Sequence, residues 1–389
     1  MSASELDPTD LRRWVHDHRA DFVALVADLC RVESPSDHPE TQAGVHTRIE
    51  AALEPLGFVA RRVPGRGTGD HLLLRRASRR KGAPMQLLIG HSDTVWPLGT
   101  LETMPVVEEQ GRLRGPGTLD MKGGLAIALL ALRALDAHGM EPELEPVLFV
   151  NADEEIGSPD SVRHVRRLAR AAERAWVLEP ALGSEGRIKT ARKGVGDFRI
   201  TIRGRASHAG LDPTAGISAI GELAHWIERL HALTDLEAGS TVNVGVVQGG
   251  TRANVVAAEA TAVVDLRVTS AEEGERLNGV IHGMTPSREG IRVEVEGGLR
   301  VPPLERTPRN RRLWEAAREE GRALGLDLDH ALAGGGSDGN TTSLYTATLD
   351  GLGCVGDGAH AVHEHIEIDR SLDRCALLAR LLLLPGLGA

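Results

Sequence analysis

Aromatic residues, cysteines and long apolar runs are all scarce in this sequence, and each scarcity excludes something. Aromatic side chains make up 3% of the 389 residues, so the core has to be aliphatic. No apolar run approaches the roughly 18 residues that a membrane-spanning helix needs. The longest runs, 125–132 and 381–384, are much shorter, and residues 1–13 have no apolar signal-peptide segment. We therefore expect a cytoplasmic protein with no membrane partner.

The cysteine pattern and the charge exclude two more classes. Cys30, Cys354 and Cys375 are an odd number and lie far apart, which predicts buried thiols in a reducing compartment rather than disulfides or a zinc knuckle. Acidic residues outnumber basic ones by 55 to 45, giving a formal net charge of -10. Such a surface repels phosphate backbones, so we expect no nucleic-acid partner, although a need for solubility would explain the same acidity.

Strand and helix patterns alternate in the first half of the chain. Apolar residues spaced by three and four predict helices over 11–29, from Thr41 to near Gly57, and over 124–137. Short apolar runs predict strands over 72–74, 85–89, 147–150 and 176–178. A helix after the third strand is expected to have Ser158 as its N-cap. The basic residues 75–81 are expected to form a solvated hairpin loop. The alternation predicts a layered α/β sheet.

The pattern changes beyond Gly194. Apolar and polar residues alternate in four segments, 197–202, 241–247, 260–268 and 291–295, and helices are predicted over 217–232 and 271–283. This describes a small α+β sandwich with one exposed sheet face. A proline-rich return linker over 301–308 and a helix over 311–324 follow. We therefore predict a discontinuous first domain, 1–193 and 304–389, carrying an inserted domain, 194–303.

Polar residues that can bind a metal follow three of the predicted strands. The segments that follow these strands contain His91, the pair Glu154-Glu155, and Glu179, and Asp120 lies in a glycine-rich turn before a helix. Ligands bind at the carboxyl edge of open α/β sheets. A single acid after a strand is more often a turn residue or an N-cap. In an adjacent pair, by contrast, one acid can bind a cation while the other moves a proton.

The donor set suits zinc and is compatible with cobalt or manganese, because it combines imidazole and carboxylates without thiolate. Asp93, two residues after His91, is a candidate acceptor that fixes the imidazole tautomer.

Six motifs in register resemble those of the aminoacylase/carboxypeptidase G family of metallopeptidases, and the likeness covers nearly the whole chain. The glutamate carboxypeptidase branch, which hydrolyses folates, is the most similar. The motifs are His91-Ser-Asp-Thr-Val95, Gly115 to Gly124, Asn151 to Ser158, Glu179-Pro180, Ser207-His-Ala-Gly210 and Gly334-Gly-Gly-Ser-Asp338. The resemblance implies a mixed-sheet α/β dizinc peptidase domain with an inserted α+β sandwich domain for dimerisation, which also acts as a lid.

The resemblance also implies roles for the metal-binding residues. Asp120 would bridge two zinc ions and precede a cis peptide bond to Met121. His91 and Glu179 would complete one site. Glu155 and His360 would complete the other, with His363 as the alternative ligand. Glu154 would be the general base, and Asp93 would support His91.

Further residues are implied to contact the substrate. His208, donated by the partner of a homodimer, would stabilise the oxyanion. Asn254, Arg267, Arg300 and Gly335 lie at positions that resemble substrate contacts. For a lone arginine in an acidic protein, however, a surface salt bridge is an equally good interpretation.

These residues predict hydrolysis of an amide or peptide bond next to a free carboxylate, in a small N-acyl amino acid or short peptide. An alternative is an N-acyl amino acid deacylase of the acetylornithine or succinyl-diaminopimelate type. A non-catalytic relative that binds peptides or metals would be expected to lack a ligand or the base, and all six positions are filled. Nucleotide binding through residues 65–69 or 334–336 is excluded, because no Lys-Ser/Thr or dinucleotide fingerprint follows.

Overall fold

The computed structural model describes residues 6–79 and 81–386, which form two compact units. Unit 1 consists of the described residues of Met1–Thr190, Arg306–Leu332 and Ser337–Ala389. Unit 2 consists of Ala191–Glu305 and Ala333–Gly336. The second unit is therefore inserted into a discontinuous first one. Residues 333–336 group with unit 2, although they follow the predicted return to the first domain.

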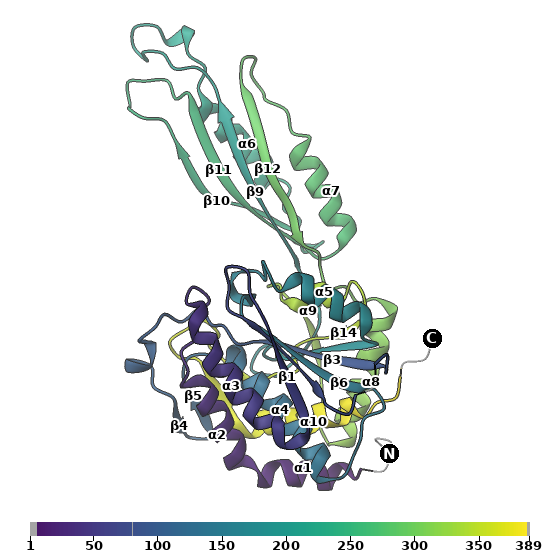
Figure 1. Ribbon diagram of the computed structural model, residues 1–389. Coiled ribbons are helices and arrows are strands. Elements are labelled where there is room, and N and C mark those ends of the chain that lie inside the picture. The colour runs from purple at the N-terminus through teal and green to yellow at the C-terminus, as the bar shows by residue number, and fades with distance from the viewer. Residues whose placement is uncertain (1–5, 80, 387–389) are drawn as a thin grey trace. The chain divides into compact units, whose positions relative to one another are not determined.

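Unit 1 is built on a mixed six-stranded sheet with the order β1-β2-β6-β3-β7-β14 (Figure 1). Neighbours from β6 to β14 pair in parallel, and β2 pairs antiparallel with both β1 and β6. The strands are β1 Phe58–Val63, β2 His71–Arg76, β3 Met85–His91, β6 Glu145–Asn151, β7 Arg174–Val177 and β14 Ala347–Leu349. The predicted mixed α/β class is thus confirmed.

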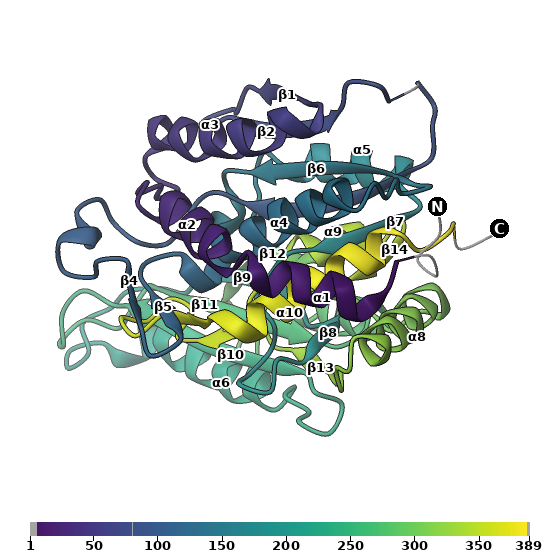
Figure 2. The ribbon, with the colours of Figure 1, turned by 90° about the horizontal axis from the view of Figure 1, so that it is seen from below.

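Both faces of this sheet are buried, which explains why its central strands are continuous apolar runs. Every residue of β3 is buried, and successive side chains enter different cores. Leu88 joins the larger core with α4, while Leu87 and Ile89 join the smaller core with Val165 of α5. On the face of the sheet that borders the larger core, helices α1, α2, α4 and α10 pack together (Figure 2). The helices are α1 Pro8–Asp17, α2 Arg19–Cys30, α3 Gln42–Leu53, α4 Gly123–Ala137, α5 Val162–Ala171, α8 Pro308–Ala323, α9 Asp338–Thr342 and α10 Ile368–Leu382.

Two small sheets complete this part of the chain. One has the order β15-β16-β5-β4, and the other pairs β13 with β8. Their strands are β4 Val107–Glu109, β5 Arg112–Arg114, β8 Ile188–Arg192, β13 His330–Ala333, β15 Gly356–Asp357 and β16 His365–Glu367.

Unit 2 is an antiparallel sheet of order β10-β11-β9-β12 with two helices on one face (Figure 1). In β9 and β11, buried and more exposed residues alternate, as a one-sided sheet requires. The buried residues, among them Phe198, Val264 and Leu266, pack against Trp226 and Leu277 from the helices. The elements are β9 Gly194–Arg203, α6 Ala219–His231, β10 Thr241–Gly249, β11 Glu259–Val268, α7 Ala271–His282 and β12 Arg292–Val301.

Three local predictions are wrong. The first helix is broken at His18 into α1 and α2, although the apolar stripe continues across the break. The hairpin loop predicted over 75–81 is wrong for the described residues, because Arg75 and Arg76 belong to β2 and β6 lies between β2 and β3 in the sheet; Arg80 lies outside the described residues. Ser158 is not an N-cap: its φ is +54°, its hydroxyl donates to Asp338, and α5 begins only at Val162.

All three cysteines are buried, as the sequence predicted. Within the described ranges, no helix is both long and apolar enough to cross a membrane.

Candidate metal centre

The carboxyl edge of the central sheet gathers the predicted ligands. His91 is the last residue of β3, Glu155 follows β6, and Glu179 follows β7. Asp120 lies in a kinked turn, Thr118–Lys122, that leads into α4; the backbone angles of Asp120 and Met121 are not helical, and the peptide bond between them is cis. Parallel neighbours end at the same edge, so these distant segments of the sequence converge.

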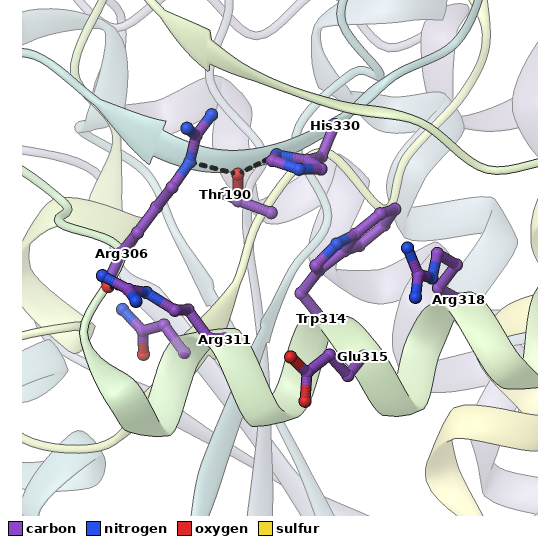
Figure 3. A pocket seen from close by; sticks show the side chains of 8 residues that line it. Thr190, Arg306, Arg311, Trp314, Glu315, Arg318 and His330 are labelled. Carbon is purple, nitrogen blue, oxygen red and sulfur yellow. Dashed lines mark hydrogen bonds between the residues drawn. The ribbon is translucent and has the colours of Figure 1, made fainter.

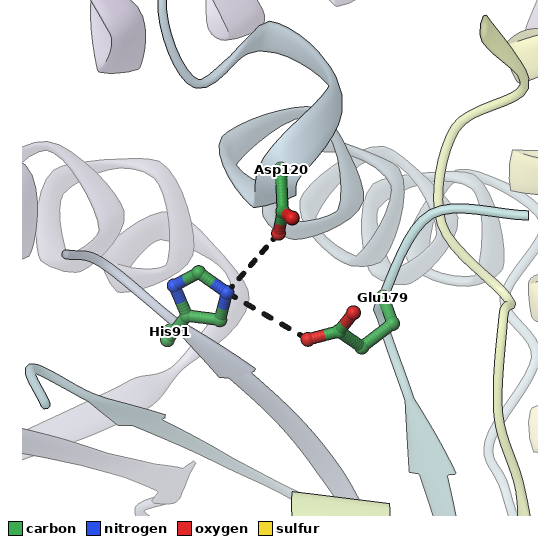
Figure 4. A group of neighbouring side chains, drawn as sticks. All are labelled: His91, Asp120 and Glu179. Carbon is green, nitrogen blue, oxygen red and sulfur yellow. Dashed lines mark ion pairs between the residues drawn. The ribbon is translucent and has the colours of Figure 1, made fainter. Parts of the chain in front are cut away.

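His91, Asp120 and Glu179 form the first group of potential ligands (Figure 4). The Nε2 atom of His91 lies 3.3 Å from Oδ1 of Asp120 and 3.7 Å from Oε1 of Glu179. His91 and Glu179 are buried, and the side chain of Asp120 is 15% exposed.

Asp120, Glu155 and His360 form the second group. The Nε2 atom of His360 lies 3.3 Å from Oδ2 of Asp120 and 3.2 Å from Oε2 of Glu155. The two carboxylate oxygens of Asp120 therefore face different groups. This is the geometry that a carboxylate shared by two cations requires. The alternative histidine, His363, lies outside the group, with its Nε2 3.9 Å from Asp357.

The spacing within each group suits a divalent cation. Two ligand atoms held about 2.0–2.1 Å from a tetrahedral zinc ion lie roughly 3.3–3.4 Å apart, which is close to the observed separations. Nε2 of His91, Oδ1 of Asp120 and Oε1 of Glu155 are buried atoms without a hydrogen-bond partner in the described structure. Buried polar atoms are rarely left in this state, and a metal ion would satisfy them.

Nδ1 of His91 faces Asp93, which thereby sets the tautomer of the ring. Nδ1 of His91 lies 2.9 Å from the backbone carbonyl of Asp93, to which it donates, and 3.4 Å from the carboxylate. The lone pair of Nε2 is thereby directed to the ligand group. The Asp93 carboxylate accepts instead from the backbone N–H groups of Glu154 and Glu155, at 3.2 and 3.1 Å, and from the Ser36 hydroxyl at 2.7 Å. Asp93 therefore orders the two-acid segment as well as the imidazole.

The pKa values of the ligand residues are shifted so that positive charge is favoured on the imidazoles and negative charge on Asp120. Burial lowers the pKa of His91, but Asp120 and Asp93 outweigh it and hold this pKa well above the ordinary value. Asp120 and then Glu155 raise the pKa of His360 to about 10. Burial raises the pKa of Asp120, yet His360 and His91 hold it far below the usual range. The raised pKa values favour protonated rings at His91 and His360, so metal binding has to release protons.

Glu154 differs from the ligands. It belongs to neither group, and burial followed by the nearby Glu179 carboxylate raises its pKa well above that of an ordinary glutamate. A carboxyl group with a raised pKa beside two groups of potential metal ligands is suited to accept a proton.

Glu364 is a supporting residue that the sequence did not single out for this role. Its buried carboxylate accepts hydrogen bonds from the backbone N–H groups of Gly117, Leu119 and Asp120, and from Nε1 of Trp96. The turn that carries Asp120 is thus fixed by one side chain from more than 240 residues further along the chain. No local sequence signal predicts a contact over that distance.

Asp338 and Lys189 were also missed as supporting residues. Asp338, buried at the start of α9, accepts from the side chains of Asn151 and Ser158, which bracket the segment of Glu154. Lys189 places its Nζ 3.7 Å from Oε2 of Glu179.

The predicted substrate-contacting residues all belong to unit 2. His208 and Asn254 are exposed neighbours, joined by a hydrogen bond from Ala209 N to Asn254 O. Arg267 and Arg300 flank the start of β9 and pair with Asp265 and Asp197. The carbonyl of Gly335 accepts from Arg192.

A layered α/β sheet with two carboxylate-imidazole groups at its carboxyl edge, sharing one aspartate, defines a metal-dependent hydrolase. The sequence profile of "Peptidase family M20/M25/M40" matches residues 87–384, and the chain belongs to this family. The resemblance inferred from the motifs is thereby confirmed, and with it the enzyme class of a metal-dependent peptidase or amidohydrolase.

Relatives with different substrates match over nearly the whole chain. Carboxypeptidase G2 of Pseudomonas sp. (strain RS-16) is 26% identical over 96% of this chain and 91% of its own length. Acetylornithine deacetylase of Myxococcus xanthus is 31% identical over 92% of this chain and 95% of its own. Among solved structures, aminopeptidase PepT of Bacillus cereus superposes with a TM-score of 0.79 at 22% identity, covering 94% of this chain and 98% of that one. That last likeness bears on the fold alone.

Proposed function

We propose that this protein is a dizinc exopeptidase of the glutamate carboxypeptidase type, which cleaves an amide bond next to a free carboxylate. The observation that carries the proposal is the position of Asp120, whose two oxygens face separate ligand groups beside the unliganded Glu154. The similarity to carboxypeptidase G2 over nearly the full length supports the substrate class.

In this proposal His91, Asp120 and Glu179 would hold one zinc ion, and Asp120, Glu155 and His360 would hold the other. Bound zinc supplies Lewis acidity and lowers the pKa of water toward about 7. Glu154 accepts the proton of the attacking water on its carboxylate and delivers it to the departing nitrogen. Its raised pKa favours the acceptance step, because the carboxylate is then a stronger base than that of an ordinary glutamate.

We also propose that His208 donates a hydrogen bond to the oxyanion in the active site of a partner subunit. Nδ1 of His208 accepts from the backbone N–H groups of Gly210 and Leu211, both at 3.1 Å. In the neutral ring the proton is then on Nε2. The exposed edge of this imidazole is therefore a donor, as an oxyanion contact requires.

The substrate carboxylate would be bound by Arg267 or Arg300, with Asn254 and Gly335 as further contacts. Arginine suits this role because its guanidinium can hold a carboxylate with two parallel hydrogen bonds. Both arginines are paired with aspartates in the present structure. A substrate carboxylate that binds either arginine therefore has to share the guanidinium with the aspartate or displace it.

The proposal is tested by replacing Glu154 with glutamine. Turnover of an N-acyl glutamate should fall by about 10²–10⁴-fold, the usual contribution of a general acid-base group, while zinc content and thermal unfolding stay unchanged. Glu102→Gln, which changes an exposed glutamate, is the matched control and should keep full activity. Comparable turnover in Glu154→Gln would remove the proposed base.

A deacylase is the second candidate, and the 31% identity to acetylornithine deacetylase favours it. Both reactions use the same metal centre, so they differ only in substrate recognition. The ratio of kcat/KM for an N-acyl glutamate to that for N-acetylornithine decides between them, and a ratio below one supports the deacylase. Zinc rather than cobalt or manganese, the homodimer and the cytoplasmic location stay predictions.

A further inference from the structure

A pocket of about 250 Å³ lies in unit 1 outside the metal centre (Figure 3). One wall is formed by α8, from Asn310 to Arg318. The other comes from Thr190 on β8 and His330 on β13, two strands that pair with each other. The lining residues are Thr190, Arg306, Asn310, Arg311, Trp314, Glu315, Arg318 and His330. None of them belongs to either ligand group.

The charge of this pocket is unusual for an acidic protein. Three of its eight lining residues are arginines and one is an acid, whereas the chain as a whole carries a net charge of -10. In the part of the chain that the structure describes, no carboxylate lies within 4.0 Å of the guanidinium groups of Arg306, Arg311 or Arg318. The surface salt bridge, the ordinary arrangement for an arginine in such a protein, is therefore absent at all three positions.

Hydrogen bonds within the pocket orient Arg306 and Arg311 through their Nε atoms, and their Nη atoms stay available to a ligand. Nε of Arg306 donates to the Thr190 hydroxyl at 3.0 Å, and that hydroxyl lies 2.8 Å from Nδ1 of His330 (Figure 3). Nε of Arg311 donates to the carbonyl of Arg306 at 2.8 Å. Among the described residues, the Nη atoms of these two arginines make no hydrogen bond.

The remaining surface is partly apolar. Trp314 is 8% exposed, and its ring centroid lies 4.9 Å from that of His330. Burial, followed by the charge of Arg306, lowers the pKa of His330, so its ring is neutral at physiological pH. A ligand with a short carbon skeleton can pack against these rings while its charged groups reach the guanidinium groups.

We propose that this pocket binds a small organic anion with two or more negative charges, carried by carboxylate or phosphate groups. Guanidinium groups recognise both with paired hydrogen bonds. The volume is at the small end of ligand pockets, which suits a metabolite rather than a cofactor.

The test is calorimetric titration of the metal-loaded protein with two probes, succinate and inorganic phosphate. The proposal predicts a saturable site with a Kd of about 1 mM or tighter for at least one of them. Binding of succinate alone identifies a carboxylate ligand, and binding of phosphate alone identifies a phosphate ligand. If neither binds in this range, the proposal is wrong.

A pair of double variants separates this site from anion binding at the metal centre. Arg311→Gln with Arg318→Gln should weaken binding by roughly 100-fold, about tenfold for each charged contact. Arg312→Gln with Arg322→Gln removes the same charge from exposed positions of α8 outside the pocket and should leave binding within about twofold. Equal binding by both double variants would place the anion elsewhere and overturn the proposal. In the unmodified protein, the NMR signal of the Trp314 indole should shift on titration, and a signal that stays fixed at saturation would contradict it.

Discussion

Replacing Glu364 with glutamine removes the support of the turn that carries Asp120. Oε1 of Glu364 accepts from Leu119 N at 2.9 Å and Asp120 N at 3.1 Å, while Oε2 accepts from Gly117 N at 3.1 Å and Trp96 Nε1 at 2.8 Å. A glutamine keeps one acceptor oxygen and places an NH₂ group against the other two donors. Each lost hydrogen bond to a charged acceptor costs about 1.5–3 kcal/mol, so the loss of two should cost roughly 3–6 kcal/mol of folding stability in unit 1.

The same change should also weaken metal binding, because Asp120 is proposed to bridge both ions. Substitution of a residue that orients a metal ligand typically costs about 10–100-fold in affinity. Zinc affinity is measured by competition with a chelator, and stability by urea unfolding followed through hydrogen exchange of α4. Glu102→Gln, an exposed position, serves as the control for both. The reasoning is refuted if Glu364→Gln binds zinc as tightly as the unmodified protein and loses no more than about 1 kcal/mol of folding stability.

Two further predictions concern pH. Because the pKa of His360 is about 10 and that of His91 is well above its ordinary value, both rings lose a proton on binding metal. We expect this in the Glu154→Gln variant between about pH 5.5 and 6.5, a range below the pKa near 7 of zinc-bound water. There the product of the two zinc-binding constants should rise at least about 100-fold per pH unit, because two protons are released. A product that does not change with pH would contradict this. In unit 2, burial raises the pKa of Glu222, but bonds from Ser287 and Trp226 outweigh it and lower this pKa. Ionised Glu222 thus stabilises the unit above the unfolded pKa of about 4.3, and the benefit is lost as the pH falls through the lower folded pKa. Hydrogen exchange of α6 should be faster in Glu222→Gln than in the exposed-site control Glu228→Gln at neutral pH, and the two should converge in acid.

The sequence predicted the elements that carry the site well, for a physical reason. Strands buried on both faces are short apolar runs, and the first polar residue after each run lies at the carboxyl edge of the sheet. His91 and Glu179 could therefore be located from local patterns alone. The strands of unit 2 could also be predicted, because one face of their sheet is exposed and apolar and polar residues therefore alternate along them.

Contacts between distant segments could not be predicted in this way. The bond from Ser158 to Asp338 joins residues 180 positions apart and replaces the N-cap that the local pattern favoured. The partner of Arg300 is Asp197, which depends on the register of β12 against β9. Such pairings follow from the packing of the whole unit, and spacing along the chain contains no information about them.

The number of metal ions bound per chain tests the central claim most directly. Elemental analysis of the zinc-loaded protein should find two ions per chain, one in His360→Ala and none in Asp120→Ala, because Asp120 faces both ligand groups. Two tightly bound ions in Asp120→Ala, or no ion in the unmodified protein, would contradict the account.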